Sequence, residues 1–228
     1  MPGIKTSYSR RSFLKVTTLT GGGMLLTFNL FTGCKSPVSD ALALPKEWYQ
    51  LNGYLKIGEN GLVTLMSPNP EIGQNVKTSM PMLVAEELDI DWKNVMVEQA
   101  PLNTDLYKPM QIAGGSNSIS ASWEAMRTAG ATAKAMLKQA AANEWKVPVA
   151  EIETKDGMLS HKASNKSAGY GAFASAASKL PVPEKVELKK VKDFKIIGTS
   201  RKNVDGQKIV TGQPLLVWIT KKRVCLSR

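Results

Sequence analysis

Two short polar loops, each containing glycine and each followed by a predicted helix, are the segments best suited to chemistry. The first comprises residues 72–75 (IGQN) and the second residues 113–118 (AGGSNS). The first backbone N–H groups of a helix lack partners and carry partial positive charge, so they favour a bound anion. Together the loops predict a cradle for an anionic cofactor.

Other residues that could do chemistry are few. The sequence has only two cysteines and one histidine, which leave little material for a thiolate metal site or a Ser–His–Asp triad. His161 lies in a polar segment and is expected at the surface. Glu86 and Glu87 are adjacent on a predicted helix and point in different directions, so we expect a solvated face rather than a catalytic pair.

The net charge of +11 is concentrated at the two ends of the chain. The first 33 and last 15 residues hold eight basic residues and no acidic one, which leaves 22 basic and 19 acidic residues between them. No basic stripe with interleaved aromatic residues occurs, so we expect no nucleic-acid partner. The 43% hydrophobic content is enough for the middle of the chain to bury a core.

The N-terminus resembles a twin-arginine export signal. Arg10 and Arg11 follow a polar start and precede the weakly apolar, uncharged run 16–32. Residues 1–33 are therefore expected to address the chain to the twin-arginine translocase and the periplasm. Cys34 follows small residues as in a lipoprotein cleavage box, so a lipid anchor at Cys34 is expected. The alternatives are ordinary cleavage nearby, or a chance arginine pair before a buried helix.

The remaining pattern alternates strands and helices, which favours an α+β fold with helices packed on a mixed sheet. Asn60-Gly61 predicts a tight hairpin. Pro81 within the first helical stripe predicts a late start or a kink. The expected elements are a linker over 34–51, a hairpin over 54–67, a helix over 75–88, a strand over 95–97, an alanine-rich helix over 118–146, a strand pair over 149–159 turning at Asp156-Gly157, a helix over 170–179 and a basic strand over 186–197.

The spaced residues of this pattern resemble the N-terminal part of the molybdenum hydroxylase large subunit, of the exported isoquinoline 1-oxidoreductase beta-subunit type within the xanthine and aldehyde oxidase family. The matching positions are Glu71-Ile72-Gly73-Gln74, Thr78, Ala85-Glu86-Glu87-Leu88, Asp91-Trp92, Val95, Gly114-Gly115-Ser116, Ala129-Gly130-Ala131, Trp145, Val147-Pro148, Asp156-Gly157, Gly198, Arg201, Asp205, Lys208 and Thr211-Gly212. The resemblance implies that residues 52–197 form part of a molybdopterin-binding domain. It implies that residues 198–214 begin the next domain, an α/β hammerhead.

The resemblance also implies a cofactor of the molybdopterin cytosine dinucleotide type, held in part by the two loops. Gln74 would donate its amide to the pterin or to the oxo group of the metal. Ser116, Ser118 and nearby N–H groups would hold pterin or phosphate oxygens, although capping of the following helix is a compatible role. The implied cofactor contacts are Gly73, Gln74, Gly114, Gly115, Ser116 and Ser118. The family has glycine at position 75, and asparagine tolerates the left-handed backbone better than most residues.

Enzymes of this family hydroxylate N-heterocycles or oxidise aldehydes with oxygen from water. The resemblance implies a small-molecule substrate, an iron–sulfur partner subunit and a cytochrome acceptor. The family's catalytic glutamate falls beyond residue 228, so we expect no catalytic residue and no metal ligand here, and an inactive fragment. The alternatives are a non-catalytic exported lipoprotein or binding module that keeps the fold, and a degraded pseudogene product.

The basic tail departs from the family pattern after Pro214. With one nucleotide restored, the back-translated tail can be read as a sequence typical of the family. Residues 215–228 are therefore expected to be frameshifted, which would explain Cys225 and the basic bias.

Overall fold

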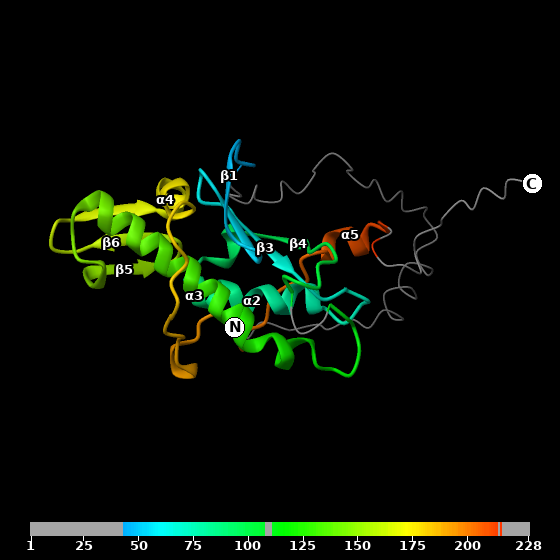
Figure 1. Cartoon of the computed structure of the whole chain (residues 1–228). Coiled ribbons are helices and arrows are strands. Elements are labelled where there is room, and N and C mark those ends of the chain that lie inside the picture. Colours follow the sequence, from blue (N-terminus) through cyan, green and yellow to red (C-terminus); the bar gives the residue numbers. More distant parts are fainter. Residues whose placement is uncertain (1–42, 108–110, 214, 216–228) are drawn as a thin grey trace, which may run out of the picture. The chain divides into compact units, whose positions relative to one another are not determined.

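A four-stranded mixed sheet organises the first half of the structure. The computed structural model describes residues 43–107, 111–213 and 215. The sheet order is β1 (Trp48–Asn52), β2 (Leu55–Gly58), β3 (Val63–Ser67) and β4 (Val95–Gln99). Neighbouring strands are antiparallel except β3 and β4, which are parallel. The sheet and the helices beside it confirm the α+β prediction (Figure 1).

The β2–β3 hairpin forms where Asn60-Gly61 predicted it. Gly61 has a φ of 85°, and the Asn60 side chain accepts a hydrogen bond from the Leu62 N–H at 3.1 Å. The linker predicted over 34–51 is wrong at its C-terminal end. Trp48–Asn52 is strand β1, which pairs with β2 from Trp48 opposite Gly58.

Helix α2 (Val76–Leu88) connects the parallel strands β3 and β4 and so completes a β–α–β unit. It begins at Val76 and contains Pro81, so the predicted late start is wrong. Helix α3 (Ser118–Trp145) packs along α2. A Cβ at Gly130 of α3 would lie 2.4 Å from the Val84 carbonyl oxygen of α2, so only glycine permits this approach. The small residues of α3 therefore serve close helix packing.

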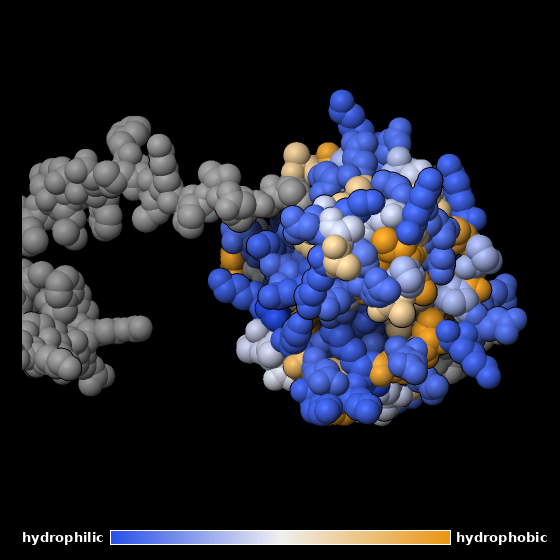
Figure 2. Space-filling view, turned by 90° about the vertical axis from the view of Figure 1, so that its left-hand side faces the viewer, coloured by the Kyte–Doolittle hydropathy of each residue, from blue (hydrophilic) through white to orange (hydrophobic). Residues whose placement is uncertain are grey.

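A second, three-stranded antiparallel sheet consists of β5 (Ile152–Lys155), β6 (Met158–His161) and β7 (Lys166–Gly169). The β5–β6 turn lies at Asp156-Gly157 as predicted, whereas β7 was not foreseen. Helix α4 (Tyr170–Ala177) follows, and its buried Tyr170 hydroxyl donates to the Leu88 carbonyl at 2.7 Å. The face seen in Figure 2 is mostly hydrophilic, with small separate apolar patches.

The segment after α4 contradicts the strand predicted over 186–197. It holds one short 3-10 helix, η3 (Val191–Asp193), and ends in α5 (Gly206–Val210). The reason is that successive N–H groups of residues 195–197 bind a buried glutamate instead of a strand. Two further 3-10 helices of the same length are η1 (Trp92–Asn94) and η2 (Val149–Glu151). Within the described residues, no helix combines the length and apolarity needed to cross a membrane.

Candidate functional site

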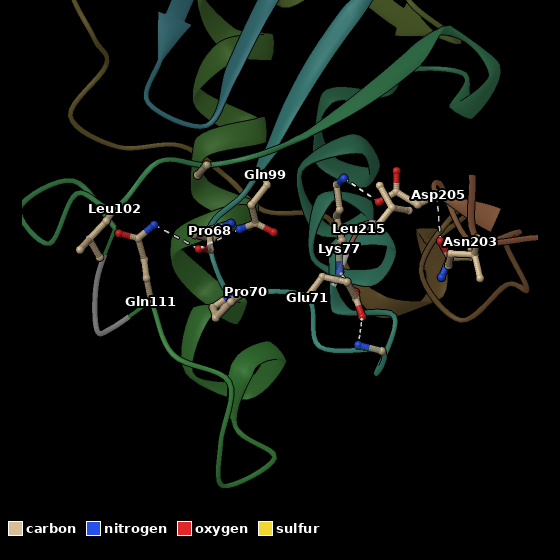
Figure 3. Close-up of a pocket in the computed structure, with 13 residues that line it drawn as sticks. Pro68, Pro70, Glu71, Lys77, Gln99, Leu102, Gln111, Asn203, Asp205 and Leu215 are labelled. Atoms are coloured by element: carbon tan, nitrogen blue, oxygen red, sulfur yellow. Dashed lines mark hydrogen bonds and ion pairs between the residues drawn. The ribbon is translucent and has the colours of Figure 1, made fainter. Parts of the chain in front are cut away.

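A pocket with a volume of about 390 Å³ lies at the carboxyl ends of the parallel strands β3 and β4 (Figure 3). Pro68 and Pro70 follow β3, and Gln99 ends β4. The N-terminal turn of α2 and the segment 203–209 form other parts of the wall. Ligands of open α/β sheets bind at the carboxyl ends of parallel strands, so this is the best candidate site.

The Glu71 carboxylate occupies the N-terminus of α2. Its Oε1 accepts hydrogen bonds from the N–H groups of Gly73 at 2.7 Å and Asn75 at 3.0 Å, and its Oε2 accepts one from Lys77 at 2.9 Å. These are the N–H groups that we expected to bind an anionic cofactor. The chain therefore supplies its own anion at the first loop, a role for Glu71 that we did not predict.

The rest of the first loop is folded back on itself. The Gln74 amide donates to the Pro70 carbonyl at 3.1 Å and accepts from the Ile72 N–H at 2.7 Å. Gly73 lines the pocket with a φ of 106°. Asn75 has a φ of 65°, so asparagine adopts the left-handed conformation expected where the family has glycine. Gln74 thus keeps one amide hydrogen without a partner among the described residues, but it does not line the pocket.

The second loop is open. Gly114, Gly115 and Ser116 are exposed, and a Cβ built on Gly114 meets nothing within 4 Å. Gly115 and Ser116 have φ values of 61° and 54°. Asn117 holds the N-cap position of α3 without a side-chain hydrogen bond, so neither Ser116 nor Ser118 caps the helix. The alternative capping role for these serines is therefore wrong.

Asn69, which is 4% exposed, joins the second loop to the end of β3. Its amide donates to the Ser118 hydroxyl at 2.9 Å and to the Ile112 carbonyl at 3.0 Å. The Gln99 amide binds the Asn69 carbonyl at 3.1 Å, and the Gln111 amide binds the Pro68 carbonyl at 3.1 Å. The structure thus gathers both loops around one strand end, but residues 113–118 do not line the pocket itself.

These amides were missed by the sequence analysis. Asn69, Gln99 and Gln111 lie in or beside loops, where polar residues are common and carry no signal of their own. Their partners are backbone carbonyls, which a sequence pattern cannot assign. The family resemblance did not single them out either.

An ion pair closes the pocket on the side of α5. Lys77 Nζ lies 2.6 Å from Asp205 Oδ2, and Lys208 Nζ lies 3.3 Å from Asp205 Oδ1. Burial by itself raises the pKa of Asp205. The hydrogen bonds and charges of Lys77 and Lys208 outweigh that effect, so the pKa lies below its usual value. Asp205 is therefore an anion at neutral pH and ties α2 to α5.

Two surface predictions are wrong. Glu86 and Glu87 are fully buried, because cationic and backbone donors from distant segments surround them. His161 is 4% exposed, with its ring nitrogens 2.8 Å from Glu151 Oε2 and 2.7 Å from Ser164 Oγ. The part of the chain described here contains no cluster of His, Cys, Asp and Glu that could hold a metal ion.

Comparison with known proteins identifies the family. Residues 21–212 match the model of the molybdopterin cofactor-binding domain. This chain belongs to that family. The predicted resemblance to the molybdenum hydroxylase large subunit is confirmed, and all residues that line the pocket at β3 and β4 except Leu215 lie inside the matched range.

Three curated relatives agree with this assignment. The beta subunit of isoquinoline 1-oxidoreductase from Brevundimonas diminuta is 36% identical over 138 residues, which cover 58% of this chain and 17% of that protein. A nicotinate dehydrogenase subunit of Pseudomonas putida is 26% identical over 193 residues, covering 84% and 16%. A membrane-bound aldehyde dehydrogenase of Gluconacetobacter polyoxogenes is 30% identical over 145 residues, covering 60% and 18%. The chain spans about a sixth of each relative's length.

Solved structures give a weaker similarity. A Cu,Mo-CO dehydrogenase aligns with a TM-score of 0.44 at 24% identity, over 54% of this chain and 15% of that chain. Quinoline 2-oxidoreductase of Pseudomonas putida aligns with a TM-score of 0.41 at 19% identity, over 56% and 16%.

Proposed function

We propose that this chain forms part of the cofactor cradle of a molybdenum-dependent oxidoreductase that hydroxylates N-heterocycles or oxidises aldehydes with oxygen from water. The family match over residues 21–212 carries the proposal. The names of the relatives, which refer to isoquinoline, nicotinate and aldehyde oxidation, support these substrate classes. The segment alone is expected to be inactive.

The two loops near the end of β3 suit different parts of a pterin cofactor. The first loop suits the uncharged edge of a pterin, because Gln74 has a free amide hydrogen while Glu71 already fills the N–H groups. The second loop suits a phosphate, because Gly114 leaves its backbone open to close approach. We therefore assign the pterin to Gln74 and Gly73, and the phosphate to Gly114, Gly115 and Ser116.

Molybdopterin, when bound, supplies two-electron chemistry at its metal. The residues described here would bind and orient it rather than take part in that chemistry. We further propose the cytosine dinucleotide form of the cofactor, an iron–sulfur partner subunit that receives the electrons, and a cytochrome beyond it. The relatives are named as subunits, which supports a multi-subunit assembly.

Metal analysis of the native full-length product tests this function. We expect about one molybdenum per chain, together with a fluorescent pterin released by acid and iodine. A Gly114→Trp variant should lose both, because the bulky side chain fills the open approach. A folded product without molybdenum or pterin would contradict the proposal and support a non-catalytic binding module.

Export is a separate proposal that rests on Arg10, Arg11 and Cys34, which lie outside the described residues, as do residues 216–228 of the tail. We propose transport by the twin-arginine translocase and a lipid anchor on Cys34. Replacing both arginines by lysine should leave the protein in the cytoplasm. Replacing Cys34 by alanine should abolish incorporation of labelled fatty acid, and incorporation that persists would contradict the anchor.

A further inference from the structure

Glu86 lies fully buried in the last turn of α2 and holds a segment more than 100 residues away. Its Oε2 accepts hydrogen bonds from the N–H groups of Lys195 at 2.9 Å, Ile196 at 2.6 Å and Ile197 at 3.0 Å. Its Oε1 accepts one from Lys189 Nζ at 2.8 Å. One carboxylate therefore replaces the strand partner that these N–H groups would otherwise need.

Glu87, also fully buried, holds the start of the same segment. Its Oε1 accepts from Arg127 Nε of α3 at 2.8 Å, and its Oε2 accepts from the Lys189 N–H at 3.0 Å. Arg127 Nη2 donates to the Lys189 carbonyl at 2.6 Å. The backbone of Lys189 is thus fixed on both sides, and its ammonium also pairs with Asp89.

The segment Lys189–Asp205, here called the strap, leads from these carboxylates to the pocket. At its far end the Val204 N–H donates to Thr78 Oγ1 at 3.1 Å, and Asp205 pairs with Lys77. Asn203 and Asp205 line the pocket wall (Figure 3). Helix α2 therefore holds the strap at both ends, by Glu86 and Glu87 at its C-terminus and by Lys77 and Thr78 at its N-terminus.

We propose that Glu86 and Glu87 are positioning residues that set the strap against α2 and so place Asn203 and Asp205 in the pocket wall. Buried carboxylates that are fully hydrogen-bonded fix one arrangement, because any shift leaves charge and N–H groups unpaired. The positional part of the inference is independent of the cofactor. Its consequence for cofactor retention rests on the proposed function.

Hydrogen–deuterium exchange of the full chain tests the positioning role. Glu86→Gln keeps the side-chain shape but removes the negative charge that binds the N–H groups of residues 195–197. We expect exchange to rise at least 10-fold at residues 195–197 and at least 3-fold at residues 203–209, with β3 and the 127–141 part of α3 unchanged. The matched control is Glu98→Gln, which removes an exposed carboxylate 3.4 Å from Lys56 and should change none of these regions.

A second variant separates the two ends of the strap. Lys77→Gln should raise exchange at residues 203–209 but not at 195–197. If Glu86→Gln fails to fold, Lys189→Gln is the alternative. It keeps the hydrogen bonds from residues 195–197 to Glu86 and should raise exchange of the strap by about 3-fold. Exchange that rises equally in β3, or that leaves residues 203–209 unchanged in the Glu86→Gln and Lys189→Gln variants, would overturn the inference.

Molybdenum content gives the functional readout in the full-length product. Glu86→Gln should retain less than a third of the wild-type molybdenum per folded chain, while Glu98→Gln retains all of it. Full retention in the Glu86 variant, despite a loosened strap, would refute the link to the pocket. A wild-type protein without molybdenum would contradict the proposed function, and the exchange result would still decide the positioning role.

Discussion

The two glycine-containing loops look alike in the sequence and behave differently in the structure. The first loop is closed, because Glu71 binds the N–H groups of Gly73, Asn75 and Lys77. The second loop is open, and a Cβ on Gly114 would meet nothing within 4 Å. A helix N-terminus attracts negative charge, but the charge can come from the chain as readily as from a ligand. This contrast is the basis of our proposal that the second loop takes the phosphate and the first loop the neutral pterin edge.

Removal of the Glu71 carboxylate should have the largest effect on stability. Glu71→Ala leaves three N–H groups without their carboxylate and should lower the free energy of unfolding by about 2 kcal/mol. Ser116→Ala in the second loop should change it by less than about 0.5 kcal/mol, since the side chain is exposed. Urea denaturation measures both. Equal losses in the two loops would remove the contrast between them.

Low pH should destabilise the surroundings of the first loop. It should not destabilise the second loop, which has no acidic residue between positions 111 and 118. The pKa of Asp205 lies below its ordinary value of 3.8, because Lys77 and Lys208 outweigh the effect of burial. The stability that this carboxylate contributes is therefore present above that value and is lost as pH falls through the lowered pKa.

The pKa values of Glu86 and Asp89 are lowered as well. Burial opposes their ionisation, but hydrogen bonds from Lys189 and other donors keep each pKa low. Charges from Lys134 also favour ionised Asp89. We expect Tm to fall as the pH drops below about 4 and Asp205→Asn to flatten part of that fall. An unchanged pH profile in this variant would contradict the lowered pKa.

Gly73 of the first loop should matter more for stability than Gly114 of the second. Gly73 has a φ of 106°, which side chains rarely adopt, so Gly73→Ala should cost about 1 kcal/mol. Gly114→Ala meets no neighbour and should stay within about 0.5 kcal/mol of wild type. Thermal unfolding of the pair checks this. A larger loss at Gly114 than at Gly73 would reverse our view of which loop is open.

The smallest effect should be a gain. Asn75 holds a left-handed φ of 65°, and its buried Oδ1 has no partner among the described residues. Asn75→Gly removes both the backbone strain and the unpaired atom, so we expect about 0.5 kcal/mol of added stability. Chemical denaturation with Asn117→Gly as the matched change should show no such gain, since Asn117 has a negative φ. A loss of stability in Asn75→Gly would show that the strain is not there.

Local patterns predicted most of the elements, because each depends on neighbours in the sequence. The Asn60-Gly61 hairpin, the helical stripe before Leu88 and the turn at Asp156-Gly157 all form where expected. The spaced motifs also identified the family. The predicted cofactor contacts and domain boundaries stay predictions, since they concern a ligand and a longer protein.

The sequence by itself determined the α+β fold class, the family and the position of the two loops. Only the tertiary structure decided which charged groups meet. Glu86 and Ile196 are 110 positions apart, and no periodicity links a helical glutamate to N–H groups in a distant irregular segment. Burial of His161 and closure of the first loop by Glu71 likewise depend on side-chain partners that pattern alone does not assign. Hydrophobic spacing sets the elements, whereas polar partners are chosen by the geometry that packing creates.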